Sequence, residues 1–331
     1  MAASSVPLRA VPGPVAQMRS VLPAHGIETS TTLLAPSICG VRGCGVGRSG
    51  YGVCVRKSVL RGFRAQSGAT NVERGAEITS GSGKDNNVVF VAGATGNVGS
   101  RVVRELVKSG FQVRAGVRAV AKGQALLEAA KLAKTSSSEK EPVELVECDL
   151  EKQDTIANSL GNAGVVVCSI GASEKEISDV TGPYRIDYKA TENLIKAATR
   201  AKVNHFILVT SLGTTKLGWP ASILNLFWGV LIWKAKAEKA LEDSGLPYTI
   251  VRPGGMERPT DTYKETHNLR LASRDTWFGG QVSNLQVAEL IANCVSNLDR
   301  ARFKVLEAVA ETTAPLRPIE ELLAEVPAER R

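Results

Sequence analysis

Short apolar stretches alternate with amphipathic stretches of helical length along the chain from Val88 onward. The apolar stretches are rich in Val, Ile and Leu, which is typical of strands that are buried on both faces of a parallel sheet. Strands are predicted at 88–92, 112–117, 143–148, 164–169, 205–210, 247–252 and 303–307, and helices at 97–109, 119–133, 152–160, 184–201, 230–244 and 284–297. Because helices separate the strands, we expect parallel βαβ units. The pattern predicts an α/β fold with a doubly wound parallel sheet.

The first predicted strand leads directly into a glycine-rich turn and then a helix, which is the context in which a glycine pattern indicates dinucleotide binding. The turn reads Gly93, Ala94, Thr95, Gly96, Asn97, Val98, Gly99. Gly93 permits the sharp turn, Gly96 lets a pyrophosphate approach the backbone, and Gly99 lets the helix pack close to the strand. The N-terminus of the helix offers free N–H groups to the phosphates. We therefore predict a Rossmann-like, NAD(P)-binding fold in which these seven residues contact the cofactor.

The end of the second predicted strand indicates which dinucleotide binds. An acidic residue there would bind the ribose hydroxyls of NAD. This chain instead has Arg118, with Lys122 one turn further on. A guanidinium group can pair with a 2′-phosphate through two charge-assisted hydrogen bonds. The sequence therefore predicts NADP(H) as the cofactor.

Two further strand ends are expected to contact the cofactor. Asp149 and Leu150 follow the third strand, where Asp149 either meets the adenine or caps the helix at 152–160. Ile170, Gly171 and Ala172 belong to the run 168–172 that closes the fourth strand, and the small residues of this run let the chain pass close to the nicotinamide ribose. The spacing leaves both alternatives for Asp149 open.

Together with Thr210-Ser211 and the run 251–255, these motifs resemble the atypical short-chain dehydrogenase/reductase family. The segments 168–176, 224–229 and 254–260 resemble the branch that serves the protein translocon of the chloroplast inner envelope, and the resemblance covers about 84–327. It implies an NADP(H) site that includes Pro253 and Gly254. It also implies a regulatory role in protein import, with translocon subunits as partners, peripheral membrane contact, and movement between stroma, envelope and thylakoid that follows the redox state.

The catalytic residues of this family are only partly present. The family usually carries Tyr-x-x-x-Lys, in which the tyrosine gives a proton to a carbonyl group. Lys236 fits the lysine position and is expected to hold the ribose, whereas Ile232 replaces the tyrosine. Ser211 matches the serine that binds a substrate, and water or Tyr184 could substitute as proton donor. We expect weak or specialised dehydrogenase activity at best. The alternative is an NADP-dependent reductase or isomerase of a small plastid metabolite.

The basic charge of the chain is concentrated near its N-terminus. Residues 1–70 hold eight basic residues and one acidic residue, and therefore +7 of the net charge of +8. With the nearly neutral remainder, nucleic acid is not an expected partner. A leader rich in Ser, Thr, Ala, Gly and Arg is typical of a plastid transit peptide. We predict a disordered transit peptide at 1–70, a flexible linker at 71–87 and the NADP-binding domain at 88–330.

The uncharged apolar stretch at 221–233 is too short to span a bilayer. It is either a buried helix beside the nicotinamide or a surface that docks on the envelope or on a translocon partner. Vascular-plant members of this branch bind ferredoxin–NADP reductase through a C-terminal tail of Pro/Ser-rich repeats. This chain ends at Arg331, so we do not expect that contact. Widely spaced cysteines and three scattered histidines predict neither a disulfide framework nor a metal site.

Overall fold

The structure of the protein is a computed structural model that describes residues 83–133, 141–172, 179–215 and 229–329. These residues belong to one compact unit, which comprises 75–331. Its strands are β1 (Asp85–Ala92), β2 (Gln112–Val117), β3 (Val143–Glu147), β4 (Ala163–Cys168), β5 (His205–Val209), β6 (Tyr248–Pro253), β7 (Asn268–Ala272) and β8 (Lys304–Glu311). They form one sheet in the order β3-β2-β1-β4-β5-β6-β8-β7, parallel except for the antiparallel pair β7–β8.

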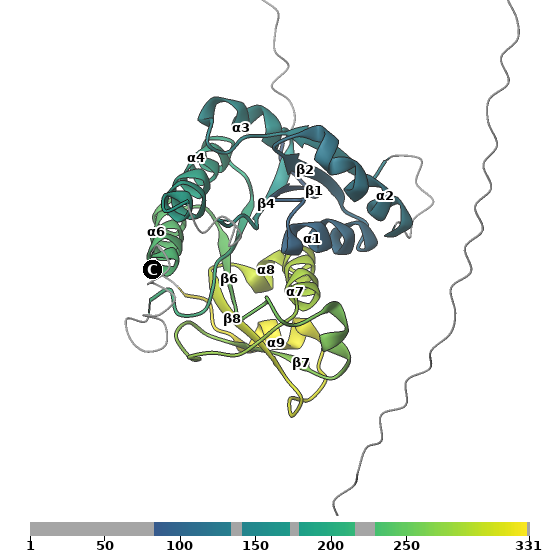
Figure 1. Cartoon of the computed structure of the whole chain (residues 1–331), viewed down its shortest axis with the longest axis vertical. Helices are drawn as coiled ribbons and strands as arrows, with labels where there is room; N and C mark the ends of the chain where they lie inside the picture. Colours follow the sequence, from purple (N-terminus) through teal and green to yellow (C-terminus); the bar gives the residue numbers. More distant parts are fainter. Residues whose placement is uncertain (1–82, 134–140, 173–178, 216–228, 330–331) are drawn as a thin grey trace, which may run out of the picture. The chain divides into compact units, whose positions relative to one another are not determined.

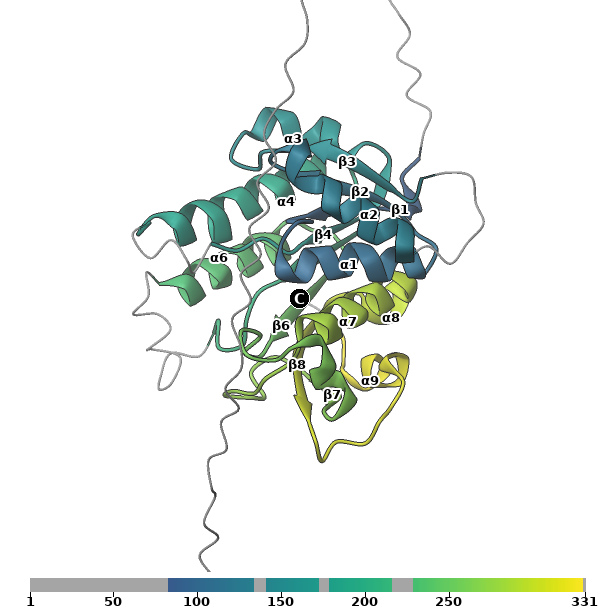
Figure 2. The ribbon, with the colours of Figure 1, turned by 45° about the vertical axis from the view of Figure 1, so that its right-hand side comes forward.

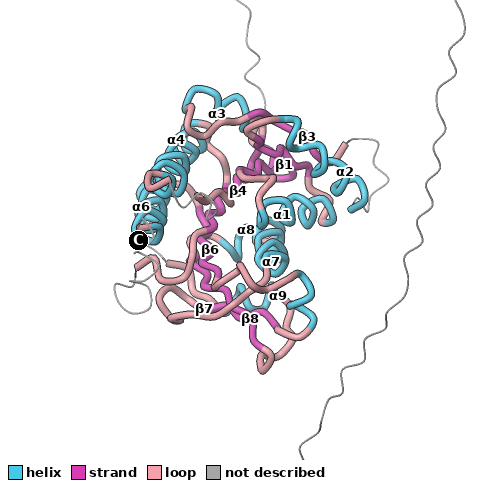
Figure 3. The backbone as a smooth tube through the Cα atoms, in the orientation of Figure 1, coloured by secondary structure: helices cyan, strands magenta, loops and turns pink. Residues whose placement is uncertain are grey.

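Helices cover both faces of this sheet (Figures 1 and 2). The α-helices are α1 (Asn97–Lys108), α2 (Gln124–Ala133), α3 (Gln153–Leu160), α4 (Thr191–Arg200), α6 (Val230–Asp243), α7 (Asn284–Ser296), α8 (Leu298–Ala301) and α9 (Ile319–Glu325). The 3₁₀ helices are η1 (Val120–Gly123) and η3 (Asp261–Glu265), and η2 (Pro183–Ala190) is a π-helix. Figure 3 shows the strands between the two sets of helices.

Two apolar clusters hold the layers together. One cluster joins α1, α2 and α7 to one face of the sheet, and the other joins α3, α4 and α6 to the opposite face. The central strand β4 is buried at every position, as expected of a parallel strand covered on both sides. The predicted doubly wound sheet is therefore confirmed, and the carboxyl ends of its parallel strands meet along one edge.

The structure differs from the predicted elements in several places. β1 begins at Asp85, so the last residues of the predicted linker belong to the sheet. The predicted helix 184–201 is divided into η2 and α4, and β7, η3, α8 and α9 were not predicted. β7 was missed because it is a half-buried edge strand that pairs antiparallel with β8, so its sequence lacks a long apolar run. The predicted transit peptide 1–70 lies outside the described residues, as does most of the apolar stretch 221–233.

In the part of the chain that the structure describes, every helix is too short or too polar to span a bilayer.

Candidate functional site

The residues predicted to bind the cofactor or a substrate lie at the carboxyl ends of six neighbouring strands. In the order of the sheet they are Asp149 after β3, Arg118 after β2, Gly93 after β1, Ile170 after β4, Ser211 after β5 and Pro253 at the end of β6. The direction in which the chain winds changes between β1 and β4, and ligands of doubly wound sheets bind at such a switch point. The arrangement suits an elongated dinucleotide, with its adenosine end toward β2 and its nicotinamide end toward β4–β6.

The glycine turn has the geometry that its sequence predicts. Gly93 adopts a φ of +77°, a conformation that other residues rarely take. A methyl group at Gly99 would overlap the carbonyl oxygen of Gly93, so only glycine allows α1 to start this close to β1. Gly96 is the residue before α1, and no side chain caps the N-terminus of that helix. The N–H groups of the first turn therefore remain available for a phosphate.

Arg118 and Lys122 lie at the adenosine end, and both are exposed. Arg118 follows the last residue of β2, and Lys122 lies in η1. No ion pair or hydrogen bond of either side chain is found within the described part of the chain. Both cations are thus accessible to an anionic group such as a 2′-phosphate.

Asp149 and Leu150 lie on the loop between β3 and α3. The side chain of Asp149 accepts a hydrogen bond from the backbone N–H of Glu151 at 3.1 Å and pairs with Lys152 at 3.6 Å. Because α3 begins after Lys152 without a side-chain cap, the helix-capping alternative for Asp149 is wrong. Leu150 packs against the apolar cluster beneath α3 and α4.

The turn after β4 contacts a buried ion pair. Asp187 of η2 is 4% exposed, and its Oδ1 lies 2.7 Å from the Nζ of Lys234 on α6. Its Oδ2 accepts the backbone N–H of Ala172 at 3.3 Å. A Cβ atom at Gly171 would lie 3.8 Å from the Lys234 Nζ, so this ammonium group reaches the predicted ribose site.

Lys236 points elsewhere. It is exposed, and its Nζ lies 4.2 Å from the centre of the Trp233 ring. The geometry therefore favours Lys234 over Lys236 for the role of holding the ribose. The sequence contained a signal for this, because Leu231, Lys234 and Glu238 follow the helical spacing of one face, whereas Lys236 lies two residues off that face. The residues four positions before the two lysines are Val230 and Ile232, and neither carries a titratable proton.

The turn after β5 lies beside the end of β6. Ser211 is half-buried, and the next residue, Leu212, donates its backbone N–H to the carbonyl oxygen of Pro253 at 3.0 Å. Gly254 is held to β8 by a hydrogen bond of 2.9 Å to Ala308. A Cβ atom at Gly254 would lie only 2.6 Å from the carbonyl oxygen of Gly280. The predicted nicotinamide end is therefore built from three tightly packed backbone segments.

An open polar cleft of about 650 Å³ extends from the glycine turn. Its lining residues come from the first turn of α1, the loop after β6 and the start of α7: Asn97, Arg101, Glu257, Arg258, Pro259, Thr260, Asp261, Thr262 and Asn284. Arg101 spans the cleft, because it donates to Asp261 at 2.6 Å and to the carbonyl oxygen of Asn97 at 2.8 Å. This side of the site was not predicted, because the sequence pattern did not reveal η3.

Comparison with known protein families identifies the kind of site. Residues 93–298 match the NAD(P)H-binding protein family. The chain belongs to this family. The expected NADP(H) cofactor is thereby confirmed at the level of the family, which binds NAD(P)H, and the glycine turn lies at the start of the matching region.

Two curated relatives are similar to this chain over most of its length. The chain is 66% identical to Protein TIC 62, chloroplastic, of Pisum sativum over 252 residues, which cover 75% of this chain and 47% of the relative. It is 59% identical to Protein TIC 62, chloroplastic, of Oryza sativa subsp. japonica over 85% of this chain and 58% of the relative. These similarities confirm the resemblance found in the motifs. The chain spans about half the length of these curated relatives.

Solved structures agree on the fold. A putative NAD-dependent epimerase/dehydratase from Bacillus halodurans matches 71% of this chain and 98% of its own, with a TM-score of 0.58 and 23% sequence identity. At this identity the match supports the Rossmann-like architecture alone.

Proposed function

We propose that the chain is an NADP(H)-binding, redox-sensing subunit associated peripherally with the protein import machinery of the chloroplast inner envelope. The observation that carries this proposal is that the predicted cofactor residues lie along one edge of the sheet, whereas an aliphatic residue stands at the position of the usual proton donor. Arg118 and Lys122 suit a 2′-phosphate, and Lys234 suits the nicotinamide ribose. No tyrosine stands four residues before either Lys234 or Lys236. Loss of such a group removes an effect of roughly 10²–10⁴-fold on the reaction rate.

The location in the chloroplast rests on the relatives and on the leader. The similar proteins of pea and rice carry the description chloroplastic, and residues 1–70 have the composition of a transit peptide. The translocon as partner rests on the resemblance of the segments 168–176 and 254–260 to that branch of the family.

Sensing through the nucleotide also agrees with the state of the described cysteines. Cys148, Cys168 and Cys294 are buried free thiols. Burial raises the pKa of Cys168 to about 11 and that of Cys294 to about 12. Because the thiolate is the reactive form, these side chains are poor redox sensors. The redox state is therefore read through NADP(H) in this proposal.

A second candidate function is an NADP-dependent reductase or isomerase of a small plastid metabolite. The observation that favours it is the position of Ser211 at the nicotinamide end, beside the turn that ends β6. Turnover of a defined carbonyl substrate above roughly 1 s⁻¹, the low end of typical enzymes, would favour this candidate.

The proposal is tested by binding of the full chain to inner-envelope vesicles in the presence of either NADP⁺ or NADPH. We expect the sedimented fraction to differ between the two nucleotides. The Arg118→Glu variant should lose this dependence, because it places a carboxylate where the 2′-phosphate binds. Lys239→Glu is the matched control, since it makes the same change of charge at an exposed lysine that pairs with Asp243.

Equal binding with both nucleotides would contradict redox sensing. Failure to bind envelope vesicles would contradict the proposed location. Binding to protein-free liposomes of the same lipids would show that the chain contacts the membrane itself and not the translocon.

A further inference from the structure

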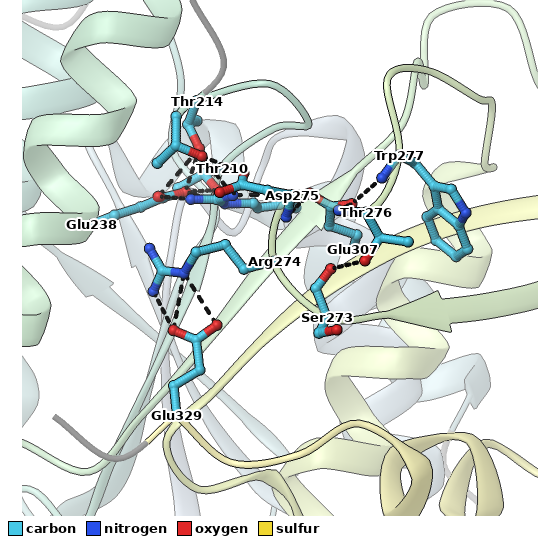
Figure 4. A network of polar contacts seen from close by, with 12 residues as sticks. Thr210, Thr214, Glu238, Ser273, Arg274, Asp275, Thr276, Trp277, Glu307 and Glu329 are labelled. Atoms are coloured by element: carbon cyan, nitrogen blue, oxygen red, sulfur yellow. Dashed lines mark hydrogen bonds and ion pairs between the residues drawn. The ribbon is translucent and has the colours of Figure 1, made fainter.

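A single buried carboxylate holds both sides of the turn that carries Ser211. Glu238 of α6 is 2% exposed. Its Oε1 accepts a hydrogen bond from Thr210 at 2.6 Å, and both of its carboxylate oxygens lie 3.2 Å from the hydroxyl of Thr214 (Figure 4). Thr210 precedes Ser211, and Thr214 follows it by three residues. The ends of the Ser211 turn are thus fixed to the same group.

Glu238 is itself held in a fixed orientation by Arg252 of β6. The Nε and Nη2 atoms of Arg252 donate to the two oxygens of Glu238 at 3.0 and 2.6 Å. The Arg252 side chain is fully buried. Such a two-pronged pair fixes the plane of the carboxylate as well as its position. The threonine hydroxyls therefore meet an acceptor that does not rotate.

The same arginine connects this turn to the loop between β7 and α7. The Nη1 of Arg252 donates to Asp275 at 2.9 Å and to Thr215 at 3.3 Å. On the far side, the buried carboxylate of Glu307 accepts the backbone N–H groups of residues 275–277 at 2.8 to 3.0 Å (Figure 4). The chain then continues to Gly280, whose carbonyl oxygen accepts the N–H of Gly255. The Ser211 turn and the loop between β7 and α7 flank the end of β6, and one ionic network joins them.

Helix α6 connects this network to the predicted ribose site. Lys234 and Glu238 are four residues apart, and therefore lie on the same face of the helix. Lys234 reaches the turn after β4, and Glu238 reaches the turn after β5. One helix face thereby supports two neighbouring turns at the nicotinamide end.

We infer that Glu238 is a positioning residue that, through Thr210 and Thr214, fixes the Ser211 turn against the nicotinamide side of the cofactor. This inference rests on the proposed binding of NADP(H). Without the two hydroxyls, the turn has no bond to the carboxylate, and its contact with the nicotinamide weakens. The adenosine end, which lies across the sheet near Arg118, is unaffected.

The test compares Thr210→Val, Thr214→Val and the double variant in the full chain. Valine keeps the shape of threonine and leaves every ion pair in place. Two ligands are titrated, NADPH and adenosine 2′,5′-bisphosphate, which carries the 2′-phosphate but lacks the nicotinamide. The double variant should bind NADPH about tenfold more weakly, because it loses two hydrogen bonds to a charged group. Its affinity for the bisphosphate should stay within about twofold of the wild type, since the adenosine side is unchanged.

Thr249→Val is the matched control. Thr249 is a buried threonine of β6 whose hydroxyl bonds to His205 and to the carbonyl oxygen of Ala301, away from the network. This variant should lower the unfolding temperature and leave the affinity for both ligands unchanged. A merely structural effect of the network variants would have the same signature.

The inference is overturned if the double variant binds NADPH as the wild type does, or loses affinity for both ligands equally. If the double variant does not fold, Thr214→Val alone retains the bond of Thr210 and should show a smaller loss for NADPH only. An unchanged ratio of the two affinities in that variant would also overturn the inference. If the wild type binds neither ligand, the proposed function fails, and the inference with it.

Discussion

We propose that the choice between NADP(H) and NAD(H) depends on Arg118. It is exposed at the end of β2, and within the described residues no carboxylate neutralises it. A guanidinium group binds a 2′-phosphate through two charge-assisted hydrogen bonds, each worth roughly 1.5–3 kcal/mol. Its sequence position alone predicted this role, because the end of the second strand is where a dinucleotide fold reads the adenosine ribose.

Replacement of Arg118 by Glu is expected to weaken NADPH binding by tenfold or more, on the order of 1.4 kcal/mol, and to leave NADH binding nearly unchanged. The loss reflects both the missing hydrogen bonds and the repulsion between the new carboxylate and the phosphate. Titration calorimetry with both cofactors measures it, with Lys239→Glu as the control for the change in charge. An equal loss for NADPH and NADH would show that Arg118 does not contact the 2′-phosphate.

At the scale of elements, helix α6 shows both the reach and the limit of sequence interpretation. The pattern predicted the helix within one residue of its observed end. The family motif then favoured Lys236, whereas the buried face of the helix presents Lys234, 15% exposed, to Asp187. A motif fixes a spacing along the chain, but the face that a helix buries depends on its neighbours. Here the neighbour is η2, a π-helix that no periodicity in the sequence reveals.

We therefore predict opposite outcomes for two neighbouring lysines of α6. Lys234→Met should weaken NADPH binding about tenfold, because it removes an ammonium group from the nicotinamide ribose. Lys236→Met should leave NADPH binding within about twofold, since that side chain lies over Trp233 on the exposed face. Fluorescence titration with NADPH measures both. Because Lys234→Met leaves the buried Asp187 without its cation, the double variant Lys234→Met/Asp187→Leu separates loss of the contact from loss of structure. Restored NADPH binding in that double variant would show that Lys234 does not contact the nicotinamide ribose.

At the scale of the molecule, the sequence predicted the half of the sheet formed by β1 to β4 more completely than the other half. Strands β1 to β4 are separated by helices, and each strand ends in a recognisable turn. The edge formed by β6, β8 and β7 depends instead on contacts between distant residues. Glu307 pairs with Arg252, which precedes it by 55 residues, and accepts the backbone N–H groups of residues 275–277. These separations follow no regular pattern along the chain. Charged residues of this kind appear in a sequence as solvated positions, so their burial could not be foreseen.

The same half of the sheet contains a buried histidine that is expected to make the stability of the molecule depend on pH below 6.5. His205 begins β5 and is fully buried, with its Nε2 2.8 Å from the hydroxyl of Thr249 on β6. Its Nδ1 has no hydrogen-bond partner among the described residues. Burial, with a smaller contribution from the charge of Arg302, lowers the pKa of His205 from 6.5 to about 3. The imidazole is therefore expected to be neutral in the folded state from pH 8 to pH 5.

Because the folded-state pKa lies below the unfolded-state value of 6.5, the unfolded chain binds one more proton between these values, and stability falls as the pH falls below 6.5. Each pH unit in this window costs about 1.4 kcal/mol, so the free energy of unfolding at pH 5 should be about 2 kcal/mol lower than at pH 8. Carboxylates whose pKa is lowered, such as those of Glu192 and Glu325, act only at more acidic pH. Urea unfolding from pH 8 to pH 5 measures the slope.

The variant His205→Gln keeps a polar side chain that can bond to Thr249 but does not titrate, and it should flatten the slope between pH 6.5 and pH 5. His267→Gln is the control, because His267 lies outside the sheet, stacked on Tyr263 at 3.7 Å between ring centres. If His267→Gln flattened the slope and His205→Gln did not, the buried histidine would not be the group responsible. A flat profile in the wild type would contradict the lowered pKa of His205.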